Sequence, residues 1–251
     1  MDTGLGVVVV IPTYNECENL APLTVRVREV LPDVKVLVVD DNSPDGTGEI
    51  ADTLAAESPE KVAVLHRPEK QGLGAAYAAG YQHAMQLWPD ARCFIQMDAD
   101  FSHDPSLLPS LLEAVKEADL AVGSRYTNGV SVVNWPLSRL IISKLASTYA
   151  RIVTGLPLTD STGGFKCYRL EVLRAIDLSQ IRSNGYCFQI ETSFRAWRKG
   201  FRLKDVPIVF YERQRGKSKL NLSIALEGFL IVLQLGAERL FRPSTGCNPR
   251  A

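Results

Sequence analysis

The feature that most constrains the fold of this chain is a regular alternation of short apolar runs and longer helical patterns. The apolar runs lie at residues 7–11, 34–39, 62–65, 93–97 and 120–122, and the helical patterns at residues 18–31, 46–57, 72–87 and 105–117. Short apolar runs are typical of strands buried on both faces, and their alternation with helices is typical of a parallel sheet. We therefore predict an α/β fold, a mostly parallel sheet with helices on both faces.

Polar residues follow each of these apolar runs directly. They stand at residues 12–16, 40–43, 66–67, 98–100 and 123–125. In an open α/β sheet the carboxyl ends of parallel strands meet at one edge, and ligands bind at that edge. We expect these polar segments to converge on a single ligand site.

Two carboxylates one residue apart, Asp98 and Asp100, follow the fourth apolar run. Acidic groups in this position can hold a divalent cation against a phosphate-bearing substrate. The alternative is that they serve only as turn and helix-cap residues, because Ser102 or Asp104 ahead of Pro105 is a normal helix start. The first interpretation predicts metal-assisted chemistry on a nucleotide.

The composition disfavours several classes of protein. The 251 residues carry 28 basic and 28 acidic side chains, so the chain lacks the overall positive charge that is typical of a nucleic-acid-binding protein. The five cysteines are widely spaced and form no Cys-x-x-Cys pair, which argues against a disulfide framework and a zinc site and favours a reducing cytosol. The apolar residues 7–11 are too few for a secretory signal, and we expect a protein that is not secreted.

Two common nucleotide-binding motifs are missing from the sequence. The segment Gly72-Leu73-Gly74 lacks the third glycine of the dinucleotide fingerprint and follows the third apolar run rather than the first. No Gly-x-x-x-x-Gly-Lys-Ser/Thr segment occurs in the chain. A dehydrogenase and a P-loop kinase or ATPase are therefore disfavoured.

The second half of the chain differs in character from the first. A helical pattern at residues 137–153 mixes apolar and basic residues, and a strand-like run lies at residues 206–211. The apolar stretch at 223–240 is interrupted by charged residues, and its apolar core is shorter than the roughly 20 residues that span a bilayer. We predict no transmembrane helix there, but an amphipathic helix that lies on the protein or on a bilayer surface.

The polar segments together resemble those of the family 2 glycosyltransferases, and most closely the dolichol-phosphate and polyprenol-phosphate mannosyltransferase branch. The matching motifs are Pro12-Thr13-Tyr14-Asn15-Glu16, Asp40-Asp41-Asn42-Ser43-Pro44-Asp45-Gly46-Thr47, Gly72-Leu73-Gly74, Asp98-Ala99-Asp100-Phe101-Ser102-His103-Asp104-Pro105, Gly123-Ser124-Arg125-Tyr126 and Arg213-Gln214-Arg215-Gly216-Lys217-Ser218-Lys219. The resemblance implies a GT-A-like glycosyltransferase domain at residues 1–220. A C-terminal amphipathic helix and a flexible tail are expected at residues 221–251.

The resemblance also implies roles for individual residues. The sugar nucleotide would be bound by Pro12, Tyr14, Glu16, Val39, Asp41, Asp98, Ala99, Asp100, Arg125, Arg213 and Lys219. Among these, Pro12, Tyr14 and Glu16 would line the base and ribose pocket, and Val39 and Asp41 would face the base. Asp100 and Ser102 would hold Mg²⁺ or Mn²⁺. The predicted catalytic set is Asp100, Arg125, Arg213 and Lys219.

The activity implied by the resemblance is metal-dependent transfer of mannose from GDP-mannose to a polyprenyl phosphate, with inversion at the anomeric carbon. Breaking the sugar–diphosphate bond leaves extra negative charge, which a metal with Arg and Lys side chains stabilises. A phosphomonoester acceptor is already anionic near neutrality, because its second pKa is about 6. Such an acceptor needs no dedicated general base.

A lipid acceptor implies work at a membrane. Arg125 and the basic helix at 137–153 are candidates for receiving the lipid phosphate. The apolar residues of this helix and of residues 224–235 are candidates for contact with the prenyl chain or a bilayer, and ordinary amphipathic packing on the sheet is the alternative. We expect a peripheral protein at the cytoplasmic face of a membrane, attached directly or through a membrane-anchoring protein partner.

Two later segments have open interpretations. Residues 160–169 resemble the family's Asp-x-Thr-Ser-Gly-Phe-Arg region, with Gly163 where serine is commoner. Gln189 and Glu191 stand where related glycosyltransferases place acidic residues near the acceptor, and Glu191 is either structural or sugar-binding.

Two other functions compete with mannose transfer to a lipid. One is an enzyme of the same fold that uses UDP-glucose or another sugar nucleotide, or that delivers the sugar to a carbohydrate hydroxyl. The other is a noncatalytic sugar-nucleotide-binding subunit of a membrane complex.

Overall fold

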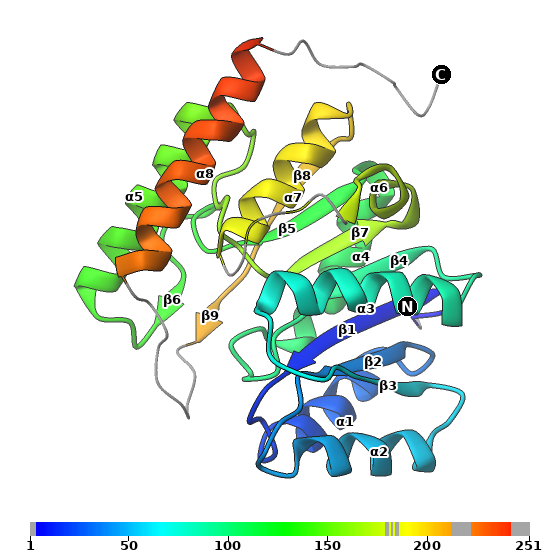
Figure 1. Ribbon diagram of the computed structural model, residues 1–251. Coiled ribbons are helices and arrows are strands. Elements are labelled where there is room, and N and C mark those ends of the chain that lie inside the picture. The colour runs from blue at the N-terminus through cyan, green and yellow to red at the C-terminus, as the bar shows by residue number, and fades with distance from the viewer. Residues whose placement is uncertain (1–3, 179–180, 182, 184–185, 212–221, 242–251) are drawn as a thin grey trace.

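The computed structural model describes residues 4–178, 181, 183, 186–211 and 222–241, and Figure 1 shows a central sheet with helices on both sides. The strands are β1 (Val7–Thr13), β2 (Lys35–Asp40), β3 (Val62–His66), β4 (Cys93–Gln96), β5 (Leu120–Ser124), β6 (Val132–Val133), β7 (Lys166–Arg169), β8 (Leu203–Pro207) and β9 (Phe210–Tyr211). The helices are α1 (Leu20–Val30), α2 (Thr47–Glu57), α3 (Leu73–Leu87), α4 (Leu108–Glu117), α5 (Leu137–Thr154), α6 (Leu170–Ala175), α7 (Tyr186–Arg198) and α8 (Leu222–Phe241). A short 3₁₀ turn, η1 (Pro105–Leu107), precedes α4.

The main sheet has the strand order β3-β2-β1-β4-β7-β5-β8. All neighbouring strands are parallel except β7, which runs antiparallel to both β4 and β5. The predicted α/β fold with a mostly parallel sheet is therefore confirmed. Because β1, β2, β4 and β5 run in the same direction, the segments that follow them leave the sheet at one edge.

The two faces of the sheet are covered by different helices. Val7, Val9 and Ile11 of β1 pack into a buried cluster with side chains of α1, α2 and α4. Val8 and Val10 point the other way, into a cluster with side chains of α3, α6 and α7. This alternation follows from the two-residue period of a strand, and it explains why a strand buried on both faces is apolar throughout.

Helix α8 lies beside α5 at one end of the molecule (Figure 1). Val232 and Leu235 of α8 are buried with Ala150 of α5 and Phe194 of α7. Within the described residues, no helix combines the length and apolar character needed to cross a bilayer. The predicted division of the chain at residue 220 falls in the segment 212–221, outside the described residues, and stays a prediction.

The prediction of one strand at residues 206–211 is wrong. The Ile208 main-chain N–H donates to the Ser124 carbonyl at the end of β5, whereas the Phe210 N–H donates to the Ser131 carbonyl beside β6. The chain therefore changes partner at Val209, and β8 and β9 belong to separate sheets. Strand β7 lies within residues 160–169, where no strand was predicted. It forms because β4 and β5 pair with it from both sides.

Candidate functional site

The predicted site residues within the described part of the chain stand in the last residues of β1 and β2 or in the segments that follow β1, β2, β4 and β5, at the carboxyl edge of the sheet. Pro12 is in β1 and Tyr14 and Glu16 follow it, Asp41 follows β2, and Arg125 follows β5. The acidic segment from Asp98 to Ser102 follows β4 between them. The structure therefore assembles the main predicted site from chain segments that are far apart in sequence.

The loops after β1 and β2 are joined by main-chain to side-chain hydrogen bonds. The Asn15 N–H donates to Ser43 Oγ (3.2 Å), and the Glu16 N–H donates to Thr47 Oγ1 (3.0 Å). The Lys70 ammonium lies 3.7 Å from the centre of the Tyr14 ring. These contacts fix the shape of the predicted base and ribose pocket without using the Glu16 carboxylate, which accepts from Asn19 Nδ2 (2.8 Å).

Asp41 is paired with an arginine from the end of β3. Arg67 Nη1 donates to Asp41 Oδ1 at 2.6 Å, and the two side chains are 9% and 6% exposed. Burial raises the pKa of Asp41, and the neighbouring Arg67 charge opposes this shift. The pair offers an acceptor beside a donor, which suits the edge of a nucleobase. Sequence reasoning noted Arg67 only as a polar strand end, because the partner of a side chain 26 positions away is not visible in one sequence.

Val39 and Ala99 are buried in the core. Val39 Cγ2 lies 2.8 Å from where a Cβ would stand at Gly80, so the Val39 side chain packs against α3. The Ala99 side chain is buried in the cluster on the opposite face. The roles of Val39 and Ala99 stay predictions, and any ligand contact from these residues must come from the main chain.

The acidic segment is held tightly. Tyr77 Oη donates to Asp98 Oδ1 (2.9 Å), and the Ser102 N–H donates to Asp100 Oδ1 (3.1 Å). Phe101 between them has φ +58°, a left-handed conformation that a bulky residue adopts only at a cost. Such strain gathers at functional sites. The helix-cap role proposed as the alternative belongs to Asp104, whose carboxylate accepts from the Ser106 N–H at the start of η1.

His103 supports this segment from inside. Its Nδ1 accepts from the Asp98 main-chain N–H (3.1 Å), and its ring stacks on Phe165 at 4.9 Å between centres. Burial lowers the pKa of His103, which keeps the imidazole neutral. Its Nδ1 is therefore used for structure, as an acceptor.

The oxygens of Asp100 and Ser102 fit a hard divalent cation. Asp100 is 6% and Ser102 is 2% exposed, and both stand at the ligand edge. Among the described residues, no group of three or more His, Cys, Asp or Glu side chains could hold a metal by itself. Mg²⁺-type sites commonly use one or two carboxylates and complete the shell with substrate phosphates and waters. The residues therefore suit a cation that binds together with a nucleotide.

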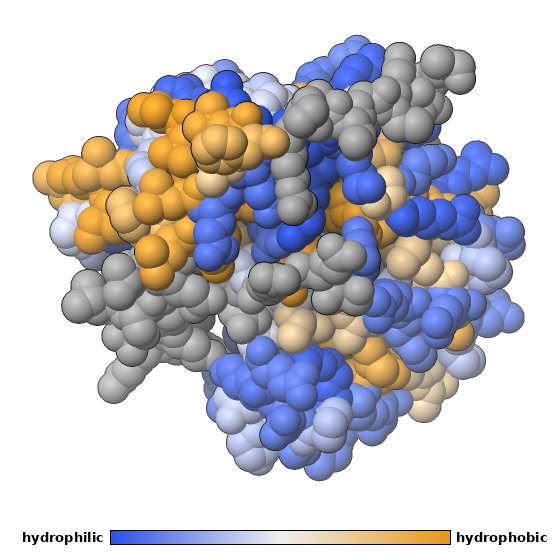
Figure 2. All heavy atoms as spheres, turned by 45° about the horizontal axis from the view of Figure 1, so that its top comes forward, coloured by the Kyte–Doolittle hydropathy of each residue, from blue (hydrophilic) through white to orange (hydrophobic). Residues whose placement is uncertain are grey.

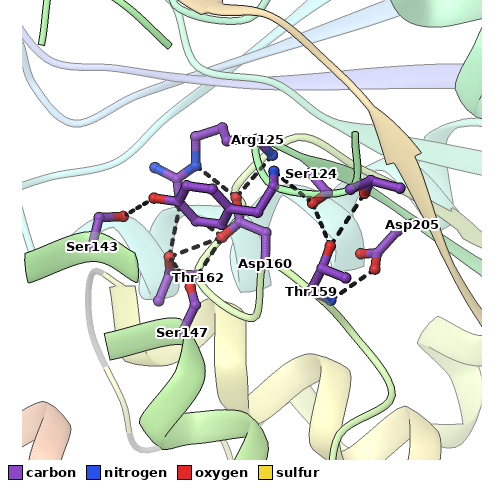
Figure 3. A network of polar contacts seen from close by, with 10 residues as sticks. Ser124, Arg125, Ser143, Ser147, Thr159, Asp160, Thr162 and Asp205 are labelled. Carbon is purple, nitrogen blue, oxygen red and sulfur yellow. Dashed lines mark hydrogen bonds and ion pairs between the residues drawn. The ribbon is translucent and has the colours of Figure 1, made fainter. Parts of the chain in front are cut away.

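Arg125 forms the centre of a buried polar network (Figure 3). Its Nε donates to Asp160 Oδ2 at 2.6 Å and its Nη2 donates to Asp160 Oδ1 at 2.7 Å. Thr162 Oγ1 accepts a further bond from Nη2 (2.8 Å), and Ser147 Oγ of α5 donates to Asp160 Oδ1 (3.3 Å). Burial alone would raise the pKa of Asp160, but the contacts with Arg125 outweigh it and hold the pKa below its usual range.

Aromatic rings surround the same guanidinium. The centres of the Tyr126, Trp135 and Phe210 rings lie 5.2–5.5 Å from Arg125 Cζ. Arg139 of α5 also lies over the Trp135 ring, with its Cζ 4.2 Å from the ring centre. Two guanidinium groups thus share one indole ring at the end of β5. Neither Trp135 nor Phe210 was expected at the site, because isolated aromatic residues have no recognisable sequence pattern.

The Glu191 carboxylate is held by Ser183 and Arg195 and has a structural role. Its carboxylate accepts from the N–H and Oγ of Ser183 (3.2 and 2.6 Å) and from Arg195 Nε (2.8 Å). The main-chain carbonyl of Gln189 accepts from the buried Lys166 ammonium at 2.6 Å. The structural alternative for Glu191 is therefore the one that the geometry supports.

Gly163 stands where no side chain fits. A Cβ built there would lie 2.6 Å from the Gly123 carbonyl oxygen, which belongs to the main chain and cannot move aside cheaply. This explains the glycine at a position where the family more often has serine.

Replacing Gly163 with serine is expected to destabilise the protein by about 1–3 kcal/mol, the usual cost of overpacking. The check is the free energy of unfolding from urea denaturation. Gly164→Ala is the control, because a Cβ there meets nothing closer than 3.5 Å. Equal stability of Gly163→Ser and the wild type would contradict the close approach of Gly163 to the Gly123 carbonyl group.

Arg213 and Lys219 lie in residues 212–221, outside the described residues, so their assignment to the phosphates stays a prediction. The last described residue before them is Tyr211, at the end of β9. Strand β9 pairs with β6 beside the rings around Arg125.

Two solved structures share the fold of this chain. Glucosyl-3-phosphoglycerate synthase from Mycobacterium tuberculosis is 15% identical, with a TM-score of 0.64 over 93% of this chain and 81% of that chain. A mannosyltransferase from Pyrobaculum calidifontis, solved with GDP-Man and Mn²⁺, is 16% identical, with a TM-score of 0.56 over 92% of this chain and 72% of that chain. The chain therefore has the GT-A fold.

Two curated relatives cover nearly the whole chain. The undecaprenyl-phosphate mannosyltransferase of Micrococcus luteus is 52% identical over 92% of this chain and 94% of its own. The polyprenol monophosphomannose synthase of Mycolicibacterium smegmatis is 49% identical over 91% of this chain and 86% of its own. Residues 8–177 match the family described as Glycosyl transferase family 2. With this match and these relatives, the chain belongs to glycosyl transferase family 2.

Proposed function

We propose that this protein transfers mannose from GDP-mannose to a polyprenyl phosphate and forms a polyprenyl phosphate mannose. The observation that carries the proposal is the near-complete coverage by relatives named for mannose transfer to undecaprenyl phosphate and polyprenol. The strained acidic segment after β4, next to the loop that follows β1, agrees with a sugar-nucleotide donor.

The donor binds across the carboxyl ends of β1, β2 and β4. Asp41, paired with Arg67, faces the base, and Tyr14 and Glu16 line the pocket beside it. Asp98 faces the ribose and the diphosphate. Asp100 and Ser102 would hold Mg²⁺ or Mn²⁺, and a neighbour of the same fold was solved with GDP-Man and Mn²⁺. When bound, the cation neutralises charge that develops on the leaving diphosphate.

The acceptor phosphate binds beside Arg125. A phosphomonoester oxygen attacks the anomeric carbon, the bond from that carbon to the diphosphate breaks, and a single displacement of this kind inverts the configuration. The attacking oxygen is already anionic near neutrality, so no residue has to remove a proton. Arg125 supplies positive charge to the phosphate, and Arg139 contacts the same Trp135 ring. In the proposed mechanism Arg213 and Lys219 meet the leaving diphosphate.

The lipid part of the acceptor meets an apolar face formed by α5 and α8. We define this face by its exposed side chains, which are Leu137, Ile141, Ile142, Leu145, Ile152, Phe229, Leu230, Leu233, Leu240 and Phe241. Figure 2 shows apolar side chains gathered over one part of the surface. Exposed apolar patches of this kind mark interaction surfaces, and basic residues on the same helix attract anionic lipid. We propose that the protein docks peripherally on the cytoplasmic face of a membrane, with or without an anchoring protein.

The double variant Ile142→Glu/Leu145→Glu is expected to weaken binding to vesicles of anionic phospholipid at least about tenfold, because two half-exposed apolar side chains leave the interface. Co-sedimentation with vesicles measures this. Val25→Glu on α1 is the matched control, since Val25 is 54% exposed and lies outside the apolar face. Undiminished sedimentation of the double variant would exclude this face as the membrane contact.

The function itself is tested with radiolabelled GDP-mannose, UDP-glucose in parallel and a short-chain polyprenyl phosphate, with and without Mg²⁺ or Mn²⁺. Metal-dependent label from GDP-mannose in the organic phase supports the proposal. Label only from UDP-glucose identifies the rival donor. Donor binding without transfer to lipid or to a carbohydrate supports the noncatalytic subunit.

A further inference from the structure

Asp160 is a carboxylate that the proposed reaction does not use, yet it is the main partner of Arg125. It stands in the loop between α5 and β7, and none of its surface is exposed. Both of its oxygens accept from the guanidinium, and the Arg125 main-chain N–H also donates to Asp160 Oδ2 (3.2 Å). Figure 3 shows the carboxylate facing the arginine, with Thr162 and Ser147 beside it.

A general base must reach the proton that it removes. Asp160 is fully buried, and its oxygens are occupied by Arg125, Ser147 and Thr162. The contacts with Arg125 also hold the pKa of Asp160 below its usual range, which makes the group a weak base. The Asp160 carboxylate is therefore placed to bind Arg125 and not to contact a substrate.

We propose that Asp160, held in place by Ser147 and Thr162, is the positioning residue that orients the Arg125 guanidinium toward the acceptor phosphate. This inference rests on the proposed function. An arginine side chain in water samples many rotamers, whereas a side-on pair with a buried carboxylate fixes both the position and the plane of the guanidinium. Only 7% of the Arg125 side chain is exposed, so a small rotation decides whether it meets a phosphate.

The same network reaches α5, the helix that carries half of the apolar face. Ser147 of α5 donates to Asp160, and Ser143, one turn earlier, accepts from Tyr126 Oη (2.8 Å). Ile142 and Leu145 on the same helix are exposed. The contact that orients Arg125 and the surface proposed for the lipid are thus joined through one helix.

Asp160→Asn tests the role with almost no change of shape. An asparagine presents one acceptor oxygen and one NH₂ group, and the NH₂ group would face a donor nitrogen of Arg125. The guanidinium must then turn. We expect the Kd and KM for a short-chain polyprenyl phosphate to rise at least about tenfold, as for loss of a charge-assisted hydrogen bond, while the KM for GDP-mannose stays unchanged.

Asp205→Asn is the matched control. Asp205 is a second, partly buried carboxylate of this network, and it accepts from the Thr159 N–H (2.7 Å), a bond that asparagine can keep. Acceptor binding in this variant is expected to match the wild type. Circular dichroism and thermal melting establish that each variant is folded.

Ser147→Ala serves as the second variant, with an expected rise of about twofold to threefold in the acceptor Kd.

A folded Asp160→Asn protein with wild-type acceptor binding overturns the inference. Equal rises in the KM values for donor and acceptor also overturn it, because they indicate a general structural role. If Asp160→Asn does not fold, Ser147→Ala decides by the same criteria. Acceptor binding is measured by the change in intrinsic tryptophan fluorescence, because one of the three tryptophans, Trp135, lies beside Arg125, and this measurement needs no turnover. A wild type that binds polyprenyl phosphate but transfers no mannose therefore overturns the proposed function alone.

Discussion

Asp100→Asn is expected to lower kcat about a thousandfold, because a catalytic metal is worth several kcal/mol of transition-state stabilisation and each tenfold costs about 1.4 kcal/mol. The fold should survive. Asp100 Oδ1 accepts from the Ser102 N–H, and an asparagine oxygen can accept the same bond. What the variant loses is the charge that holds the cation. The measurement is single-turnover transfer from GDP-mannose at saturating Mn²⁺.

Asp104→Asn is the matched control for Asp100→Asn. Asp104 lies four residues later in the same segment, and its side chain caps η1 by accepting from the Ser106 N–H. Asparagine caps as well as aspartate. Turnover should therefore stay near that of the wild type. Full activity of Asp100→Asn with the metal chelated would contradict the assignment of this carboxylate.

Arg125→Met is expected to destabilise the protein by about 3–5 kcal/mol at neutral pH, the usual cost of removing one partner of a buried ion pair. Asp160 would then keep its charge in a buried site with two hydroxyl partners and one main-chain N–H, none of which carries a charge. Transfer to the acceptor should be lost as well. Chemical denaturation measures the stability. Arg139→Met, which removes a guanidinium stacked on the same Trp135 ring, should cost less than about 1 kcal/mol.

The loss in Arg125→Met should depend on pH, with a sign set by Asp160. In the wild type the folded pKa of Asp160 lies below its unfolded value of about 3.9, so the pair stabilises the fold above that pH and loses this contribution as the pH falls through the folded pKa. In the variant, burial is unopposed and raises the folded pKa above the unfolded value. The variant therefore gains stability on acidification. The difference in stability between the wild type and Arg125→Met should be largest at about pH 8 and shrink toward about pH 5. A difference that grows on acidification would contradict an ionised Asp160 in the folded protein.

The strands and helices of the first half follow from local patterns. The predicted apolar run at 7–11 is the first five of the seven residues of β1, and the helical pattern at 72–87 is α3 to within one residue. These elements were predictable because side-chain periodicity within a segment reflects its burial. The convergence of Tyr14, Asp41 and Asp100 followed from the same patterns, since parallel strands end at one edge.

Pairings across the chain were not predictable in this way. Strand β7 is short and follows a polar glycine-containing segment, and it becomes a central strand because β4 and β5 pair with it from both sides. The run at 206–211 divides because Ser124 and Ser131 accept its hydrogen bonds from different sheets. Strand assignment depends on partners, which local pattern does not contain.

The sequence by itself determined the fold class, the edge of the sheet where the ligand site forms, and the acidic segment at its centre. Periodicity and residue type are local properties, and they are sufficient for these conclusions. Only the tertiary structure decided the partners of the site residues. Arg125 meets Asp160 across 35 positions, and Asp41 meets Arg67 across 26. A charged side chain takes its orientation and its pKa from the groups packed around it, and those groups are brought together only when the chain folds.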